Sequence, residues 1–197
     1  MRPLTKIKQK KDVLIILIGR LLSVFASLVL VRLGTEMLTS AEMGSVAQLI
    51  GFAGVVYLLF FLPLWHYFTR HLLEWHESKT LFNHIKYLVK YLIYSVIIIG
   101  FLVYLVQDIS NIIQNIEIFW VVFLIMMNFL FQALSKIATD GFNILGHRIK
   151  FVILSNLIAW LSVALAYYLY KQHGTATSWV LGIFFSYVPV SFLLFYY

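Results

Sequence analysis

Six apolar segments, each close to the length of a membrane-spanning helix, constrain the fold of this chain more than any other feature. A helix crosses a bilayer with about 20 predominantly apolar residues. Backbone polar groups must be paired inside hydrocarbon, so such segments are expected to be helical. The sequence therefore predicts an all-α integral membrane protein with six transmembrane helices. The segments cover residues 13–33, 46–65, 87–106, 118–135, 151–170 and 178–197.

The composition agrees with a membrane protein and excludes several other classes. Of the 197 residues, 62% are hydrophobic and 12% are charged, whereas soluble domains carry roughly 25% charged residues. The chain has no cysteine, which excludes disulfides, thiol nucleophiles and thiolate metal sites. Its net charge of +7 is explained by membrane topology, so we expect no nucleic-acid partner.

The Lys and Arg residues other than Arg20 are divided unequally between the two sides of the membrane. Only Arg32 and Lys171 lie on one side, and the positive-inside rule assigns the other side to the cytoplasm. We therefore expect both termini to be cytoplasmic, with outer loops at 34–45, 107–117 and 171–177. The residues assigned to the cytoplasmic side are Arg2, Lys6, Lys8, Lys10, Lys11, Arg70, Lys79, Lys86, Lys90, Lys136, Arg148 and Lys150.

Both ends of the chain allow two interpretations. The basic N-terminus followed by an apolar run has the shape of a signal peptide, but Arg20 interrupts the run and no cleavage site follows, which favours an uncleaved first helix. The sixth segment ends at Tyr196 and Tyr197 without a charged anchor. This ending favours a truncated chain or one half of a larger protein, and the alternative is an interfacial belt of tyrosines.

The longest expected cytoplasmic loop covers residues 66–86. It mixes charges with Leu72, Leu73, Trp75 and Phe82, which indicates an amphipathic helix at the membrane surface. It also contains His66, His71, His76 and His84. Their spacings of five, five and eight residues do not place them on one helical face, so we expect no metal site.

Enzymatic chemistry has no support in the sequence. There is no G-x-S-x-G nucleophile motif, no H-E-x-x-H zinc motif and no P-loop. No acidic residue lies inside any of the six apolar segments, which removes the simplest proton relay. We therefore expect a protein that is not an enzyme and has no cofactor.

Arg20 is the strongest candidate for a binding residue. It lies inside the first apolar segment, and Gly19, Ser23, Ala26 and Ser27 are its neighbours at helical spacing. A charge in a membrane helix usually faces protein or a water-filled cavity. Two interpretations are open: an anion site, because guanidinium binds phosphate bidentately, or a structural arginine that reaches backbone carbonyls or headgroups.

Other polar and small residues form stripes on the predicted helices. Arg32 is expected to pair with Glu36 at i+4 or to contact substrate. Asn128, Gln132 and Ser135 share one face of the fourth segment and point to a helix neighbour or to a cavity. Three sets of residues are expected mainly to pack: Ser155, Asn156, Trp160 and Ser162; Ala47, Gly51 and Gly54; and Ser178, Gly182 and Ser186, with a kink at Pro189.

Three short segments follow a pattern known from one transporter family. Residues 38–44 read LTSAEMG, residues 143–148 read NILGHR and are followed by Phe151, and residues 178–182 read SWVLG. They resemble, respectively, the turn after helix 1, the helix 4–5 connection and the start of helix 6 in Wzx-type polysaccharide flippases. Ala41 and Met43 stand where that family commonly has proline and an aromatic residue. The matching positions are Glu42, Gly44, Arg70, Asn143, Gly146, Arg148 and Gly182.

The resemblance implies a fold, a substrate and a partner. Wzx-type flippases belong to the multidrug/oligosaccharidyl-lipid/polysaccharide exporter superfamily, whose fold has two six-helix lobes around a central cavity. Residues 1–197 would form the N-terminal lobe. The implied substrate is an undecaprenyl-pyrophosphate-linked oligosaccharide, moved across the bacterial inner membrane for O-antigen or capsule assembly. Arg20 would hold the pyrophosphate, Asn128 and Gln132 would bind sugar, and Arg32 would be a further contact.

A single lobe would need a second one, which is expected to be a missing C-terminal half, a separate chain or a second copy. Two other classes of function remain open. A small-molecule or drug exporter of the same superfamily would be expected to carry an acidic residue in its cavity. A membrane scaffold or a non-functional remnant would not depend on Arg20.

Overall fold

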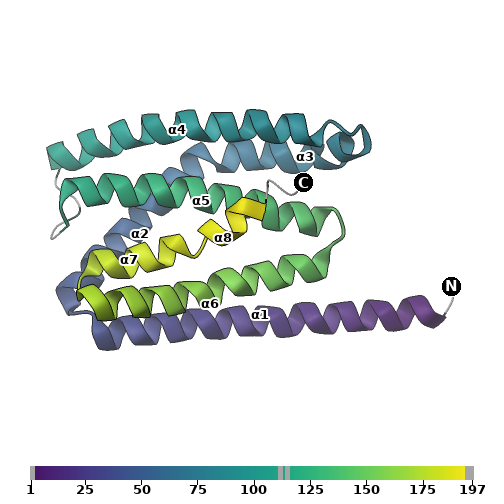
Figure 1. Ribbon diagram of the computed structural model, residues 1–197, viewed down its shortest axis with the longest axis horizontal. Helices are drawn as coiled ribbons and strands as arrows, with labels where there is room; N and C mark the ends of the chain where they lie inside the picture. The colour runs from purple at the N-terminus through teal and green to yellow at the C-terminus, as the bar shows by residue number, and fades with distance from the viewer. Residues whose placement is uncertain (1–2, 111–112, 114–115, 194–197) are drawn as a thin grey trace.

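The computed structural model describes residues 3–110, 113 and 116–193, with side chains at 13–108, 113 and 116–193. These residues form helices and contain no β-strand. In order, the helices are α1 (Pro3–Met37), α2 (Ser40–Phe60), α3 (Leu62–Glu77), α4 (Leu81–Ser110), α5 (Ile118–Ile144), α6 (Arg148–His173), α7 (Ala176–Phe185) and α8 (Val188–Ser191). Figure 1 shows that they run roughly along one common axis.

Within the described residues, five helices are long and apolar enough to cross a membrane: α1 from Val13, α2, α4 up to Asp108, α5 and α6. This confirms the expectation of an all-α membrane protein. The sixth expected helix differs, because the chain bends at Ser186 and Tyr187 and leaves two short helices, α7 and α8. Tyr196 and Tyr197, at the end of the sixth expected segment, lie outside the described residues.

Pro189 accounts for the bend. Its ring carries no N–H and would clash with the carbonyl of Phe185 in a continuous helix. The N–H of Ser186 instead bonds to the carbonyl of Ile183 at 3.3 Å, and that of Tyr187 bonds to Phe184 at 3.3 Å. These tighter i→i−3 bonds end α7 and redirect the chain into α8.

The second apolar segment continues into the expected loop almost without interruption. Only Phe61 separates α2 from α3, and Pro63 lies in the first turn of α3, where a missing N–H is tolerated. The two nearly consecutive helices thus replace the expected helix 46–65 and the beginning of the loop 66–86. α3 is amphipathic and buries Phe68, Leu72 and Trp75.

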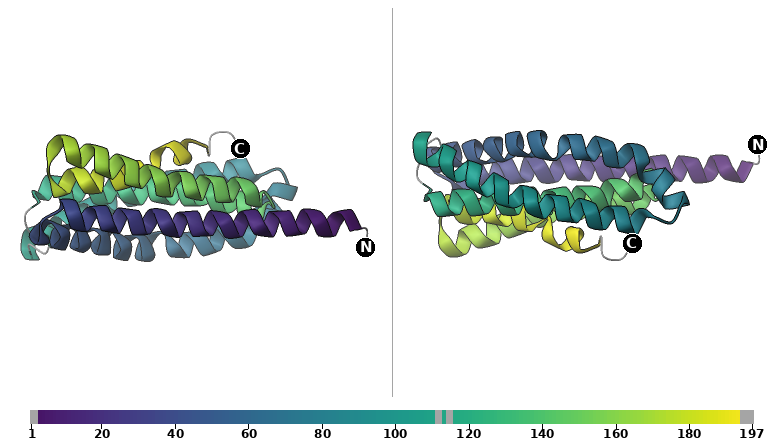
Figure 2. Two further views of the ribbon diagram at one scale, coloured as in Figure 1. Left: turned by 90° about the horizontal axis from the view of Figure 1, so that it is seen from below. Right: turned by 90° about the horizontal axis from the view of Figure 1, so that it is seen from above.

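α3 lies along the bundle beside the beginning of α4 (Figures 1 and 2). The turn between them contains Lys79 in a left-handed conformation with φ 58°, and the Ser78 and Thr80 hydroxyls lie 2.8 Å apart. Trp75 stacks on His84 of α4 with ring centroids 4.1 Å apart. Residues 66–86 therefore form most of α3, a short turn and the first residues of α4.

α5 is the central helix of the bundle and packs against α2, α3, α4, α6, α7 and α8. α1 is peripheral and contacts mainly α6; the left view of Figure 2 shows the two side by side. Glycines allow two of these close approaches. A Cβ on Gly19 would collide with the Val152 side chain, and a Cβ on Gly182 would collide with the Ala166 backbone.

Candidate functional site

α5 extends further than the apolar pattern predicts. The fourth segment was expected to end at residue 135, but the helix continues to Ile144, and it contains a stretch that is long and apolar enough to span a membrane. Lys136 and Asp140 therefore belong to a spanning helix and not to a loop. The expectation that no acidic residue lies inside the apolar segment 118–135 stands, because Asp140 lies beyond residue 135 on the same helix.

Lys136 and Asp140 form an ion pair on this extension. Nζ of Lys136 lies 2.8 Å from Oδ2 of Asp140, and the two side chains are 45% and 13% exposed. Nζ also lies 5.8 Å from the centre of the Trp65 ring, within the range of a cation–π contact. The carboxylate is thus largely withdrawn from solvent, whereas the ammonium group remains half accessible.

The pair lies in an open cleft of about 440 Å³. α5 supplies one wall, because residues at i, i+3, i+4, i+7 and i+8 share a helical face. α2 supplies Tyr57, α6 supplies the other wall, and Tyr187 closes the cleft between α7 and α8. Hydroxyl, amide and charged groups therefore converge on one space. The lining residues are Tyr57, Gln132, Ser135, Lys136, Thr139, Asp140, Phe151, Ser155, Ile158 and Tyr187.

The predicted stripe of Asn128, Gln132 and Ser135 continues into the cleft. Asn128 is buried one turn before it and donates from Nδ2 to Oε1 of Gln132 at 3.1 Å. The hydroxyl of Ser135 donates to the Gln132 carbonyl at 2.9 Å. Gln132 itself is half-buried and lines the cleft, so Asn128 orients a cleft residue without lining the cleft itself.

The order of charges is unfavourable for α5 itself. A pair in which the acid precedes the base stabilises a helix better than the reverse order seen here. A carboxylate near a helix C-terminus also opposes the helix dipole, and Asp140 lies four residues before the end of α5. Helix stability alone therefore does not explain this arrangement, which favours a role in binding.

The cleft lies toward the end of the bundle that the positive-inside rule assigns to the cytoplasm. Lys136 lies about 27 Å along α5 from Ile118, close to the hydrocarbon thickness of about 30 Å. The turn between α5 and α6 follows after Ile144. The ion pair is therefore expected near the inner boundary of the hydrocarbon, where water and headgroups reach it.

Arg20 does not line this cleft. Its side chain is exposed on α1, and no hydrogen bond or ion pair joins it to another residue within the described part of the chain. Its neighbour Ser23 donates to Oδ1 of Asn156 at 3.2 Å. On α6, Asn156 faces α1 whereas Ser155 lines the cleft, so α6 separates Arg20 from the Lys136–Asp140 pair.

Arg32 is also exposed, and it pairs with Glu36 as predicted, with Nη2 and Oε1 2.6 Å apart. The candidate residues therefore fall into three places. Gln132 lines the cleft with Asn128 bonded behind it, Arg20 lies on the flank of α1, and Arg32 lies near the other end of α1. Lys136 and Asp140 were missed because the hydropathy of the segment decreases at Ser135.

Three of the family-motif positions have structural roles, two at helix ends and one at a contact between helices. Glu42 forms a capping box with Thr39: its Oε2 accepts from the Thr39 N–H at 2.9 Å, and its own N–H bonds to Oγ1 of Thr39 at 3.3 Å. Gly146 adopts φ 83° in the turn after α5, which glycine allows at little cost. Gly182 permits the close approach of α7 to α6. The remaining positions, Gly44, Arg70, Asn143 and Arg148, are exposed.

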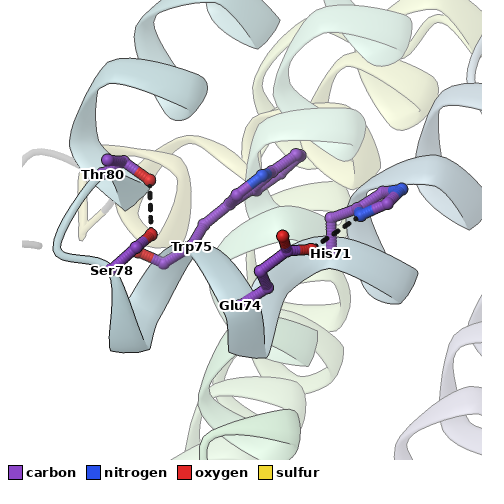
Figure 3. Close-up of polar contacts among 5 residues, drawn as sticks. All are labelled: His71, Glu74, Trp75, Ser78 and Thr80. Carbon is purple, nitrogen blue, oxygen red and sulfur yellow. Dashed lines mark hydrogen bonds and ion pairs between the residues drawn. The ribbon is translucent and has the colours of Figure 1, made fainter.

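The histidines of α3 and α4 surround an indole and do not form a ligand set. His71 and His84 each stack on Trp75, with centroids 5.6 Å and 4.1 Å from it. Nδ1 of His71 lies 3.2 Å from Oε2 of Glu74, as Figure 3 shows. Across the described residues, no group of three His, Cys, Asp or Glu side chains is arranged to hold a metal ion.

A larger hollow of about 720 Å³ lies at the opposite end of the bundle. It is lined by Glu42, Glu117, Trp120 and Thr175, among others, but by no described Lys or Arg. Glu42 and Thr175 already cap α2 and α7. His173 also lines this hollow, but it shares the hollow with two carboxylates, and the cleft around Lys136 is the better candidate for an anionic ligand.

Comparison with known proteins adds no relative to this description. No protein-family model matches the chain, and no curated protein and no solved structure gives a significant match.

Proposed function

We propose that this chain is one lobe of a bacterial inner-membrane flippase that moves undecaprenyl-pyrophosphate-linked oligosaccharides for surface polysaccharide assembly. The observation that carries the proposal is the polar cleft around Lys136 in a bundle of apolar helices. A lipid-linked sugar combines a diphosphate with many hydroxyl groups. The cleft offers a cation that can bind the diphosphate. It also offers amide and hydroxyl groups that can bond to the sugar hydroxyls. The three family-like segments support the same function.

Each polar group has a role in this proposal. Lys136 binds a phosphate oxygen, and Gln132 and Ser155 bond to sugar hydroxyls. Asn128 holds Gln132 in position. Arg20 on the flank of α1 and Arg32 near its outer end lie outside the cleft, and in this proposal they contact the substrate before or after it occupies the cleft.

A second six-helix lobe completes the transporter in this proposal. It is supplied by a C-terminal half, by another chain or by a second copy. Both termini lie in the cytoplasm, as the distribution of Lys and Arg favours. The cleft then faces the leaflet in which lipid-linked sugars are made.

A second candidate function is export of a cationic small molecule by a member of the same superfamily. Asp140 favours it, because this carboxylate lines the cleft and such an exporter was expected to need an acidic cavity residue. Lys136 compensates the charge of Asp140, which makes the cleft a poorer site for a cation. A membrane scaffold, the third class, would not require a polar cleft.

Transport in proteoliposomes distinguishes these functions. A fluorescent, short-chain polyprenyl-pyrophosphate oligosaccharide is added, and its movement between leaflets is followed with an impermeant quencher. Reconstituted together with the second lobe, the wild-type chain and a Lys86→Ala variant should transport it, because Lys86 is exposed on α4 over Phe82. A Lys136→Ala variant should not. Equal transport by Lys136→Ala, or uptake of tetraphenylphosphonium that an Asp140→Asn variant abolishes, would reject the flippase.

A further inference from the structure

We infer that Asp140 is the charge-balancing residue of the anion site, so that each anion bound by Lys136 is accompanied by one proton taken up at Asp140. This inference rests on the proposed function, since it takes the ligand of Lys136 to be a phosphate group. It assigns a residue and a coupling that the family-like motifs do not include.

The starting point is that Asp140 and Lys136 neutralise one another. Nζ of Lys136 and Oδ2 of Asp140 are 2.8 Å apart. No other Lys, Arg or His is found among the described residues that line the cleft. His147, Arg148 and Lys150 are exposed at the beginning of α6 and do not line it. The other titratable groups facing Asp140 are the neutral phenols of Tyr57 and Tyr187.

A phosphate group that binds Lys136 competes with Asp140 for the same ammonium. Lys136 is the more accessible partner, with 45% of its side chain exposed against 13% for Asp140. An incoming anion therefore reaches the ammonium first, and it leaves the withdrawn carboxylate without a counter-ion. A largely buried carboxylate without a partner, beside a second negative charge, is strongly disfavoured in its ionised form.

Protonation resolves this imbalance. The carboxylate of Asp140 accepts one proton from water in the open cleft, and the resulting carboxylic acid becomes a hydrogen-bond donor. Lys136 remains protonated throughout and exchanges the carboxylate for a phosphate oxygen. No covalent bond of the substrate forms or breaks, and the charge of the cleft changes only by the anion and the proton that enter together.

The linkage has a definite sign. Because the complex binds one more proton than the free site, affinity for the anion should rise as the pH falls, by up to about tenfold per pH unit. A neutral side chain at position 140 removes this dependence. It also removes the competitor for Lys136, so an Asp140→Asn variant should bind the anion at least as tightly as wild type at neutral pH.

The test uses the full chain purified in detergent and a dialkyl pyrophosphate diester, whose phosphates do not titrate near neutral pH. Calorimetric titrations in two buffers with different ionisation enthalpies give the number of protons taken up per anion bound. We expect about one proton for wild type and for the Lys86→Ala control. We expect binding without proton uptake for Asp140→Asn, and no binding for Lys136→Ala.

The outcomes separate the inference from the function on which it rests. Binding by wild type without proton uptake, or undiminished proton uptake by Asp140→Asn, overturns the inference and leaves the flippase proposal intact. Failure of wild type to bind the diester overturns both. If Asp140→Asn does not fold, an Asp140→Ser variant replaces it, and the pH dependence of wild-type affinity decides independently: a flat profile contradicts the proton uptake.

Discussion

The two sides of this molecule carry the same kinds of residues in different surroundings. Around α5 to α8, a cation is paired in a cleft and a glycine lies against a neighbouring helix: Lys136 bonds to Asp140, and Gly182 lies against Ala166. On α1 and α2, Arg20 is exposed and Gly51 has no atom within reach of a Cβ. Residue type within an apolar segment therefore identifies a possible contact, whereas the position of the neighbouring helices decides whether that contact exists.

The largest expected effect concerns the two glycines. A Gly182→Leu substitution should separate α7 from α6, because the backbone of Ala166 cannot move aside as a side chain can. We expect it to destabilise the chain by about 3 kcal/mol or more. A Gly51→Leu substitution should not destabilise the chain, and the higher helix propensity of Leu should add up to about 1 kcal/mol. Thermal unfolding in detergent, followed by tryptophan fluorescence, measures both, and equal loss in the two variants would contradict the packing described for α7.

The second prediction compares the two cations. Lys136→Ala leaves Asp140 largely buried without a partner, which should cost about 1–2 kcal/mol, less than for a fully buried pair because Lys136 is half exposed. Arg20→Ala removes an exposed side chain and should cost less than about 0.5 kcal/mol. Thermal unfolding in detergent, followed by tryptophan fluorescence, measures the stability of both variants. If Asp140→Asn is introduced together with Lys136→Ala, most of the lost stability should return, because no charge is left unpaired.

The smallest expected effect comes from reversing the ion pair. A double variant, Lys136→Asp with Asp140→Lys, places the acid before the base and the cation near the C-terminus of α5. It should be more stable than wild type by about 0.5 kcal/mol. The matched control, Lys136→Arg with Asp140→Glu, keeps the natural order and should show no such gain. A less stable reversed pair would indicate that the natural order is itself stabilising, which would weaken the case for a binding role.

Hydropathy alone predicted most of the fold, because span length and the break at Pro189 depend on local chemistry. Hydropathy failed where a helix does not end at the residue at which the apolar segment ends. The end of α5 was placed too early, since Lys136 and Asp140 were assigned to a loop that the helix in fact continues through. The second segment was expected to form one helix over 46–65, but α2 ends at Phe60 and α3 begins at Leu62.

The candidate site was less predictable than the fold. Gln132 was identified because its polar stripe is visible at helical spacing, and it does line the cleft. Arg20 was preferred over Lys136 because it interrupts an apolar run, but a sequence does not show which face of a helix is covered. Tyr57 lies in α2, Ser155 in α6 and Tyr187 between α7 and α8, so their convergence depends on tertiary packing that no local pattern reveals.

The most direct test of the central claim uses two adjacent residues of α6 that face opposite surroundings. The chain contains no cysteine, so Ser155→Cys and Asn156→Cys each introduce a single thiol, one in the cleft and one in the contact with α1. An impermeant thiol reagent should label the Ser155→Cys variant in membrane vesicles, and the pyrophosphate diester should slow this labelling while leaving that of Asn156→Cys unchanged. Labelling of Ser155→Cys that is absent, or that proceeds at the same rate with and without the diester, would contradict an anion-binding cleft at Lys136.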